Sequence, residues 1–293
     1  MSNTLPDLPP GFSLPFFYGT FSNIGFDYLL TDRAAVTELL KESPSGAHLS
    51  PAVFDDQVCL SFNYQLYCGQ FAKGASITQE VELNIVAFPA ADANRVPKLT
   101  YQQYAYGSDQ TRGLGFCRMH VACDSQIAID AGQKLFNEPK FKAGFDPTLP
   151  VPNDTTADAN AVDRWKAVCG VFGSADANGA FTPANTYFSF EADLHGLGPQ
   201  PVSAAPFTEY GSRKQPDGSF RPLAAPLNVF SPYVWYDLAR STGRVKLALG
   251  GAAPQGLSKK FVDLLKDRQP AGAWVYQSPP VAAQNRPYWV ATG

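Results

Sequence analysis

Charged residues are scarce in this chain of 293 residues, and neither sign dominates. They make up 17% of the sequence, with 23 lysines and arginines against 26 aspartates and glutamates, which gives a net charge of −3. A protein that binds the phosphate backbone of nucleic acid needs a basic face, so no nucleic-acid partner is expected. The 45% of hydrophobic residues is enough for a globular core and argues against wholesale disorder.

Long hydrophobic runs are also absent. No apolar stretch reaches the roughly 18 residues of a membrane-spanning helix, and residues 1–10 lack the cationic start and apolar stretch of a secretory signal. The five cysteines are odd in number and form no CxxC pair, so we expect reduced thiols rather than a disulfide framework. These features predict a cytoplasmic protein with no membrane partner. The cysteines are Cys59, Cys68, Cys117, Cys123 and Cys169.

Motifs for cofactors and metals are missing as well. The sequence contains no GxxxxGK[ST], no GxGxxG after a strand, no GxSxG and no HExxH. The three histidines, His48, His120 and His195, lie far apart in the sequence, which gives a zinc site little support. We therefore predict neither a cofactor nor a metal. Cys117 and Cys123 are six residues apart in an alternating segment, so strict alternation places both on one face of a strand, as small buried side chains.

Alternation of apolar and polar residues is the main periodic signal. It predicts half-buried strands at residues 79–88, 115–123, 187–194 and 244–250, with further strand signals at 58–67 and 229–238. Helices are predicted at 31–41, 125–136 (capped by Asp124) and 258–267 (capped by Ser258), and loops at 145–160, 173–185 and 212–223. Strands outnumber helices without regular alternation between them, which indicates a mostly antiparallel β architecture with a few helices.

Aromatic residues gather near the C-terminus, where 270–293 contains Trp274, Tyr276, Tyr288 and Trp289. Such side chains suggest an extension that packs on the body or on a neighbouring subunit. No stretch of the chain is a clear domain linker. We therefore predict a single domain over residues 1–293.

The segment 124–142 is the most informative for chemistry. Lys140 follows Pro139, whose ring restricts the backbone, and aromatic residues stand nearby at Phe136, Phe141 and Phe145. An amine in an apolar setting loses solvation, so its pKa falls and the neutral form becomes available to attack a ketone and form an imine. The ordinary alternative is a solvated lysine on the surface.

This segment resembles the active-site segment of the acetoacetate decarboxylase-like superfamily. The matching residues, in the family's spacing, are Ala128, Ile129, Gly132, Pro139 and Lys140. Residues 28–40 and the Gln79-Glu80-Val81 stretch are similar as well, so the resemblance covers about 28–144, weakens over 165–250 and is lost in roughly the last 40 residues. It implies a mainly β (α+β), antiparallel, barrel-like fold, a Schiff-base lysine at Lys140 with a lowered pKa, a pocket acid at Glu80 and a homo-oligomer. The other interpretation of Glu80 is a solvent-facing strand residue.

Several positions depart from the family's pattern. Residues 20–26 lack the arginine that precedes the first strand, and Asn63 stands where the family has a second pocket glutamate. Gln133 and Lys134 replace an Arg-Glu pair, and Phe141 replaces a second lysine. The resemblance therefore implies a divergent member, for which acetoacetate itself is a doubtful substrate and for which aldol or dehydration chemistry is an alternative.

Two further side chains on the predicted strand 115–123 are candidates. Arg118 is suited to clamp a carboxylate, and His120, in phase with it under strict alternation, is suited to acid–base work near neutrality. Each has a plain alternative, a surface arginine and a polar strand residue. The predicted substrate-binding residues are Asn63, Gln133, Arg118, His120, Phe136 and Phe141.

The sequence thus favours a cofactor-free lyase that acts on a keto acid or ketone through a Lys140 imine, with Glu80 moving protons. Either decarboxylation or aldol and dehydration chemistry fits that mechanism. A second hypothesis is a non-catalytic binding protein for an apolar carbonyl compound on the same fold. A third is a structural or assembly subunit that uses the aromatic C-terminal extension as an interface.

Overall fold

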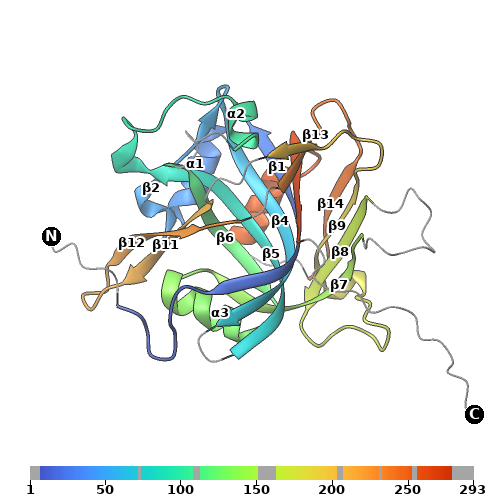
Figure 1. Ribbon diagram of the computed structural model, residues 1–293, viewed down its shortest axis with the longest axis horizontal. Coiled ribbons are helices and arrows are strands. Elements are labelled where there is room, and N and C mark those ends of the chain that lie inside the picture. Colours follow the sequence, from blue (N-terminus) through green and yellow to red (C-terminus); the bar gives the residue numbers. More distant parts are fainter. Residues whose placement is uncertain are drawn as a thin grey trace, which may run out of the picture.

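The computed structural model describes residues 7–71, 74–107, 113–150, 163–202, 207–230, 233–252 and 256–278 (Figure 1). Within these residues, fifteen strands form one mixed sheet. The strands are β1 (Phe17–Leu30), β2 (Leu49–Pro51), β3 (Val53–Phe54), β4 (Gln57–Phe71), β5 (Gly74–Pro89), β6 (Gly115–Cys123), β7 (Lys140–Thr148), β8 (Arg164–Val171), β9 (Thr186–Asp193), β10 (Gln200–Val202), β11 (Phe207–Lys214), β12 (Phe220–Leu227), β13 (Tyr233–Asp237), β14 (Val245–Leu249) and β15 (Gly272–Gln277).

Helices in the described residues are few and short, and none of them is long and apolar enough to cross a membrane. The α-helices are α1 (Arg33–Lys41), α2 (Tyr101–Ala105), α3 (Gln126–Ala131) and α4 (Leu257–Leu265). A π-helical turn, η4 (Gly132–Phe136), extends α3, and the 3₁₀ turns are η1 (Gly46–His48), η2 (Ala90–Asp92) and η6 (Pro183–Asn185).

The strand order is β10-β13-β15-β1-β4-β5-β6-β7-β8-β9-β14, so the sheet formed by the described residues is open rather than closed into a barrel. Side branches join β11 to β12 and β6, β2 to β5, and β3 to β4. All pairs are antiparallel except β6–β7 and β6–β11, which are parallel. The prediction of a mostly antiparallel β fold with a few short helices is confirmed. Figure 1 shows β7, β8, β9 and β14 on one side of the molecule and the β11–β12 hairpin on the other.

Most predicted elements are present with shifted ends. Helix α1 starts after Asp32, whose carboxylate accepts the Ala35 N–H at 3.0 Å, as an N-cap should. Helix α3 starts after Ser125, so the predicted cap at Asp124 is wrong, because that carboxylate instead accepts the Gln79 N–H at 2.8 Å. Helix α4 starts after Gly256, ahead of the predicted cap at Ser258.

Two predicted loops contain strands. Strand β7 continues to Thr148, within the predicted loop 145–160, of which 151–160 lie outside the described residues. The predicted loop 212–223 is the tip of the β11–β12 hairpin, and only its turn is irregular, with Gly218 at a φ of 86°. Alternation could not find β12, because exposed and half-buried residues follow one another along it without a fully buried face. The predicted loop 173–185 is confirmed, apart from its short η6 turn.

The apolar core lies on one face of β1, β4 and β5. Phe26, Phe62 and Tyr64 pack there against Phe190 of β9, with the Phe62 and Phe190 ring centroids 5.9 Å apart. Helices α1 and α4 add Val36, Leu40 and Phe261 to the same cluster. Of these three strands only β5 was predicted to be half-buried, and that was wrong, since its polar face is buried too.

The start of the C-terminal extension is part of the sheet. Strand β15 pairs with β1 and β13, so Trp274 and Tyr276 dock on the body of the same chain. The Trp274 indole fills the space beside Gly25, where a Cβ atom would lie only 2.2 Å from the indole Cε2. Tyr288 and Trp289 lie outside the described residues.

Candidate active site

A buried set of polar side chains occupies the second face of β1, β4 and β5. Cross-strand pairing arranges it in three rows, which are Asn23–Gln65–Glu80, Gly25–Asn63–Glu82 and Asp27–Ser61–Asn84. Apart from Gly25, the three rows contain eight polar residues, and each of these is at most 8% exposed. We call these eight residues the polar array. Burying so many polar groups is costly unless they bind one another or a ligand, so the array is a candidate functional surface.

A β-bulge in β6 brings Arg118 to this face. Leu83 pairs with His120 but Asn84 pairs with Arg118, so Met119 is an extra residue that shifts the alternation by one. The prediction that Arg118 and His120 share a face is therefore wrong. For the same reason Cys117 and Cys123 do not share a face, since Cys117 pairs with Ile85 and Cys123 with Glu80. All five cysteines are free, and only Cys68 is not fully buried.

Lys140 reaches the array from the first position of β7. Parallel pairing places it beside Val121 of β6, on the face that holds Glu80 and Glu82. The preceding π-turn η4 ends at Phe136 and is capped by Asn137, which has a left-handed φ of 54°. Gly132 at the start of that turn has no room for a side chain, because its Cβ would lie 2.7 Å from the Lys140 Cδ. The glycine of the motif thus allows the helix to approach the lysine.

The Lys140 amine is buried between two carboxylates. Its Nζ lies 2.8 Å from Glu80 Oε1 and 3.1 Å from Glu138 Oε2, and its side chain is 5% exposed. Gln65 donates to Glu80 Oε2 at 2.8 Å and the Tyr67 hydroxyl donates to Glu80 Oε1 at 3.1 Å. Glu80 is therefore not the solvent-facing residue of the alternative interpretation.

Arg118 holds three more contacts in the same cluster. Its guanidinium lies 3.0 Å from Glu82, 2.8 Å from Glu138 and 3.2 Å from Glu209 of β11. Together with Lys140 and Glu80, these residues form what we call the ionic cluster. Four carboxyl groups against two cations would give a net charge of −2 if all were ionised (2 − 4), so the cluster favours uptake of protons.

The carboxyl groups divide into two kinds. Burial raises the pKa of Glu138, but Arg118 and Lys140 outweigh burial and lower it to about 2. Burial likewise raises the pKa of Glu80, yet Lys140 and Arg118 bring it below its usual value. Burial holds the pKa of Glu209 well above its usual range despite Arg118, and Glu209 shares a hydrogen bond with Glu138. The proton that the cluster takes up is thus favoured on Glu209.

The pKa of Lys140 contradicts the sequence-based expectation. Burial lowers this pKa, but Glu138 and Glu80 outweigh burial and hold it well above the usual value for lysine. The setting was predicted to be apolar and is instead ionic, because Glu80 from β5 and Glu138 from the segment just before β7 meet the amine. In this arrangement Lys140 is an ammonium group.

The other predicted site residues fall into two groups. Asn63 lies in the polar array, where the Asn84 amide approaches it at 3.5 Å, and Gln133 donates to the Lys140 carbonyl at 2.8 Å. His120 and Phe141 lie together on the opposite face, with ring centroids 4.3 Å apart, and burial lowers the pKa of His120 to about 3. Phe136 packs in a separate apolar cluster with Leu135. The structure therefore does not bring His120, Phe136 or Phe141 to the amine.

Glu82, Glu138 and Glu209 were missed as site residues. The alternation that gave β5 already placed Glu82 in phase with Glu80, so that signal was available. Glu138 stands two residues before Lys140, but nothing in its local sequence indicates burial. Glu209 reaches the cluster only through the parallel pairing of β11 with β6, which has no local signal.

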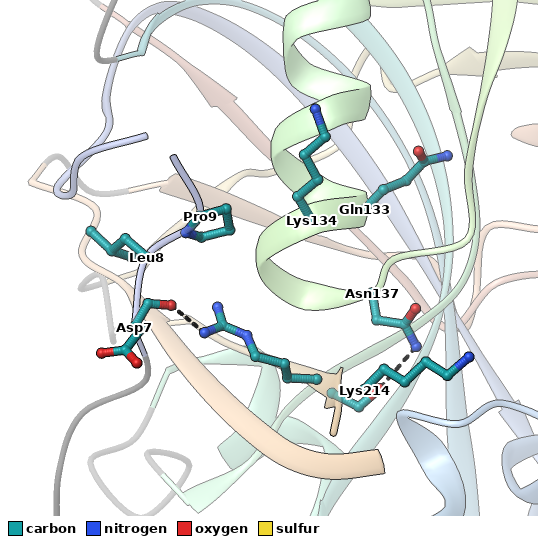
Figure 2. Close-up of a pocket in the computed structure, with 9 residues that line it drawn as sticks. Asp7, Leu8, Pro9, Gln133, Lys134, Asn137 and Lys214 are labelled. Carbon is teal, nitrogen blue, oxygen red and sulfur yellow. Dashed lines mark hydrogen bonds between the residues drawn. The ribbon is translucent and has the colours of Figure 1, made fainter. Parts of the chain in front are cut away.

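A surface pocket of about 350 Å³ lies next to the segment that carries Glu138. Figure 2 shows Gln133, Lys134 and Asn137 at the end of the helical segment, with Asn137 pointing toward Lys214 and the N-terminal residues 7–9 lying beside the segment. Asn137 donates to Ser212 at 3.0 Å and so ties the segment to β11. The pocket is lined by Asp7, Leu8, Pro9, Gln133, Lys134, Asn137, Ser212, Arg213 and Lys214, none of which belongs to the ionic cluster.

Asp27 should make stability depend on pH. Burial raises its pKa from 3.8 to about 6, although Tyr101 donates a hydrogen bond at 3.0 Å that opposes the shift. The folded state then binds the proton more tightly than the unfolded state, so the free energy of unfolding falls as pH rises from 4 to 6. Relative to wild type, Asp27→Asn should gain about 3 kcal/mol between pH 3.5 and pH 7 (about 2.2 pH units at 1.36 kcal/mol each).

Urea unfolding at several pH values measures this difference. The Asp56→Asn variant is the control for the loss of one carboxylate, because Asp56 lies at an exposed turn. A flat difference for Asp27→Asn would show that Asp27 ionises with the same pKa in the folded and unfolded states.

Comparison with known proteins gives the fold but no close relative. No family model matches the sequence, and no curated protein matches it. Among solved structures, the enduracididine biosynthesis enzyme MppR, complexed with a condensation product of pyruvate and imidazole 4-carboxaldehyde, has a TM-score of 0.54 at 13% identity, over 92% of this chain and 85% of that one. An acetoacetate decarboxylase-like enzyme from Sphingomonas wittichii RW1 has a TM-score of 0.55 at 13% identity, over 89% and 88%.

A structure of acetoacetate decarboxylase is similar too, with a TM-score of 0.52 at 14% identity over 91% of this chain and 86% of that one. The likeness extends over nearly the whole of each chain, whereas the sequence identity is too low to transfer an activity. The protein has the fold of the acetoacetate decarboxylase-like enzymes.

Proposed function

We propose that the protein is a cofactor-free lyase that forms a Schiff base between Lys140 and the carbonyl group of a keto acid or ketone. The observation that carries this proposal is the buried Lys140 amine, 2.8 Å from Glu80 and 3.1 Å from Glu138. A lysine beside proton acceptors, shielded from water, is suited to nucleophilic catalysis. The position of Lys140 in the motif that resembles the superfamily supports the same role.

The first steps follow from the contacts. The ammonium gives a proton to Glu80, its nearer carboxylate at 2.8 Å, and the neutral amine attacks the carbonyl carbon to form a carbinolamine. Protonation of the carbinolamine hydroxyl by Glu80 releases water and leaves a protonated imine. This imine keeps the positive charge of the original ammonium, so the same two carboxylates stabilise it.

The protonated imine then accepts the electron pair of an adjacent bond. Loss of carbon dioxide, or cleavage of a C–C bond in a retro-aldol step in which Glu80 takes the proton of the β-hydroxyl group, yields an enamine. Glu80, carrying that proton or one taken up from water, then protonates the enamine at carbon and restores a protonated imine. Hydrolysis returns the amine. MppR, which shares this fold, has been solved with pyruvate and with a condensation product of pyruvate, which supports a small carbonyl compound as the ligand here.

Reductive trapping tests the proposal. The protein is incubated with a ketone or keto acid and borohydride, digested, and the peptides are analysed by mass spectrometry. The expected result is a reduced adduct on Lys140. An adduct only on other lysines, or no adduct with any carbonyl compound of a broad panel, would refute the imine.

The binding-only hypothesis has less support from the site. A protein that holds an apolar carbonyl compound gains nothing from eight buried polar side chains beside its ligand. If ketones bind but neither trapping nor turnover is seen in wild type or in Lys140→Ala, and the affinity of the two is equal, the binding-only function replaces the lyase.

Glu138 should control the pH at which Lys140 reacts. Glu138→Gln removes the larger of the two carboxylate effects that raise the pKa of Lys140, so this pKa should fall. Below the midpoint the neutral fraction of Lys140 is then larger, so the trapping rate at pH 8 should be higher than in wild type. The measurement is the trapping rate from pH 6 to 11.

The control for this prediction is Asp130→Asn, which removes an exposed carboxylate that pairs with Lys134 at 2.9 Å on the same segment. Its profile should match wild type. A Glu138→Gln midpoint at or above the wild-type midpoint would contradict the electrostatic assignment.

A further inference from the structure

Two amide oxygens of the polar array lack partners. Within the described residues, Oδ1 of Asn23 and Oδ1 of Asn84 accept no hydrogen bond, although the side chains are only 5% and 0% exposed. A buried acceptor without a donor costs about 1–3 kcal/mol, so such atoms are usually matched by water or by a ligand. Both atoms belong to the face that also carries Glu80.

Glu80 and Glu82 fix the orientation of the Asn23 and Asn84 amides, in the case of Asn23 through Gln65. Gln65 must direct its Nε2 toward Glu80 and Glu82, which it reaches at 2.8 and 3.0 Å, so its Oε1 is left to accept from Asn23 Nδ2 at 3.1 Å. Asn84 must direct its Nδ2 toward Glu82 Oε2, at 3.1 Å. In each case the amide oxygen is the atom left over, because a carboxylate cannot donate. Flipping either amide would place two acceptors against each other.

The polar array is therefore suited to bind a ligand group that donates hydrogen bonds, and it is poorly suited to bind an anionic group. A ligand carboxylate lying along it would face Glu80, Glu82 and Asp27. The nearby guanidinium of Arg118 already contacts three glutamates, and Lys140 contacts two. A ligand ammonium group would be buried against two neutral amide oxygens, which do not balance its charge. A ligand hydroxyl group donates to the same oxygens without changing the charge of the site.

We propose that the carbonyl substrate of Lys140 bears hydroxyl groups and no carboxylate next to its carbonyl carbon, and that Asn23 and Asn84 accept hydrogen bonds from those hydroxyls. This inference rests on the proposed function and narrows it from keto acids and ketones to hydroxylated ketones or aldehydes. It favours the aldol type of C–C cleavage over decarboxylation, because a β-hydroxy carbonyl compound has a hydroxyl for a carboxylate to deprotonate.

Three methyl ketones of nearly equal size test the choice on wild-type protein. Hydroxyacetone, 2-butanone and pyruvate differ in one group, a hydroxymethyl, an ethyl or a carboxylate. Each is titrated in the borohydride assay, and trapping at Lys140 is divided by the trapping of free Nα-acetyl-lysine to remove differences in carbonyl reactivity. Hydroxyacetone should reach half-maximal trapping at a concentration about tenfold lower than the other two. Equal or better trapping of pyruvate or 2-butanone overturns the proposal while leaving the imine intact.

Substitutions of Asn84 and Asn23 test whether these residues bind the hydroxyl group of the ligand. Asn84→Leu and Asn23→Leu keep the side-chain size and remove the acceptor oxygen together with the amide donor to Glu82 or to Gln65. Hydroxyacetone has a single hydroxyl group, so at least one of the two variants should raise the hydroxyacetone concentration for half-maximal trapping about fivefold more than it raises that of 2-butanone. Asn94→Leu, at an exposed turn, is the matched control and should change neither value. If one array variant fails to fold, the other variant and the wild-type comparison still decide the outcome. Equal effects on hydroxyacetone and 2-butanone would contradict hydroxyl recognition.

A carbonyl-free measurement separates this inference from the imine. Binding of erythritol, 1-butanol and butyrate is followed by ligand-observed NMR on wild type and Asn84→Leu. Erythritol should bind wild type, and its binding should weaken severalfold in the variant, while butyrate should not bind. If erythritol binds in this way but no ketone is trapped, the array stands and the lyase fails. If ketones are trapped and erythritol does not bind, the lyase stands and this inference fails.

Discussion

Lys140→Ala is expected to lower the yield of reductively trapped ketone by roughly three orders of magnitude or more. The reason is that Lys140, itself an ammonium at rest, can pass its proton to Glu80 or Glu138 in a buried site, where the same carboxylates stabilise the protonated imine. The adduct of an exposed lysine lacks this buried stabilisation. The measurement is mass spectrometry of the intact protein and of its peptides after borohydride treatment.

Lys142→Ala is the matched control, two residues along the same strand. Its ammonium donates to the Asp124 carbonyl and lies 4.7 Å from the centroid of the Phe172 ring, away from the ionic cluster. Trapping in this variant should stay within about twofold of wild type, since the Lys140 contacts are untouched. If trapping survives in Lys140→Ala but disappears in Lys142→Ala, the reactive amine is that of Lys142 and not that of Lys140.

Loss of Lys140 also leaves two buried carboxylates without their cation, so folding must be measured beside trapping. Lys140→Met combined with Glu80→Gln removes one charge of each sign and should fold better than Lys140→Ala. If the double variant is folded by circular dichroism and unfolds cooperatively in urea, its lack of trapping reports on chemistry. Trapping by the folded double variant would exclude Lys140 as the nucleophile.

Arg118→Met is expected to cost about 3–5 kcal/mol of the free energy of unfolding at pH 7. The guanidinium contacts Glu82, Glu138 and Glu209 at 2.8–3.2 Å, and its removal leaves their charge to Lys140 alone. Urea unfolding monitored by tryptophan fluorescence gives the value. Arg95→Met is the control, because the Arg95 side chain is 85% exposed and makes a single long ion pair, 3.5 Å from Asp92. Its loss should change the free energy of unfolding by less than about 0.5 kcal/mol.

The loss should depend on pH with a definite sign. In wild type the pKa of Glu138 is lowered to about 2, so its stabilisation is present above the unfolded value of 4.5 and is lost as pH falls toward 2. In Arg118→Met the dominant lowering effect is gone and burial raises the pKa of the same carboxyl. The variant therefore loses stability as pH rises, and its deficit relative to wild type should shrink between pH 7 and pH 4. A deficit that is constant over this range, or below 1 kcal/mol at pH 7, would show that Arg118 does not compensate these carboxylates.

Alternation of apolar with polar residues predicted β4, β5, β6, β9, β13 and β14, but it did not predict β1, β7, β8 or β15. It could not tell whether the polar face meets water or protein. In β5, Glu80, Glu82 and Asn84 have the spacing of a solvated face, and yet they are at most 2% exposed. Burial of that face follows from segments distant in sequence, such as Trp274 of β15, which packs beside Gly25.

The structure places Lys140 beside Glu80, whereas the apolar surroundings predicted for the lysine were wrong. One extra residue in β6, Met119, moved Arg118 to the site and His120 away from it, and local alternation gives no sign of such a bulge. Phe141 follows Lys140 directly and so points to the other face, which removes one of the aromatic neighbours that the linear sequence suggested.

The amino-acid sequence by itself determined the β architecture, the apolar core and the segment that carries the reactive lysine, because these depend on periodicity and on residues close together in the chain. Only the tertiary structure decided the charge of that lysine and the chemistry of its neighbours. The physical reason is that a pKa depends on the groups that surround an atom in space, and here Glu80, Glu138 and Arg118 come from three different segments that meet only when the sheet has formed.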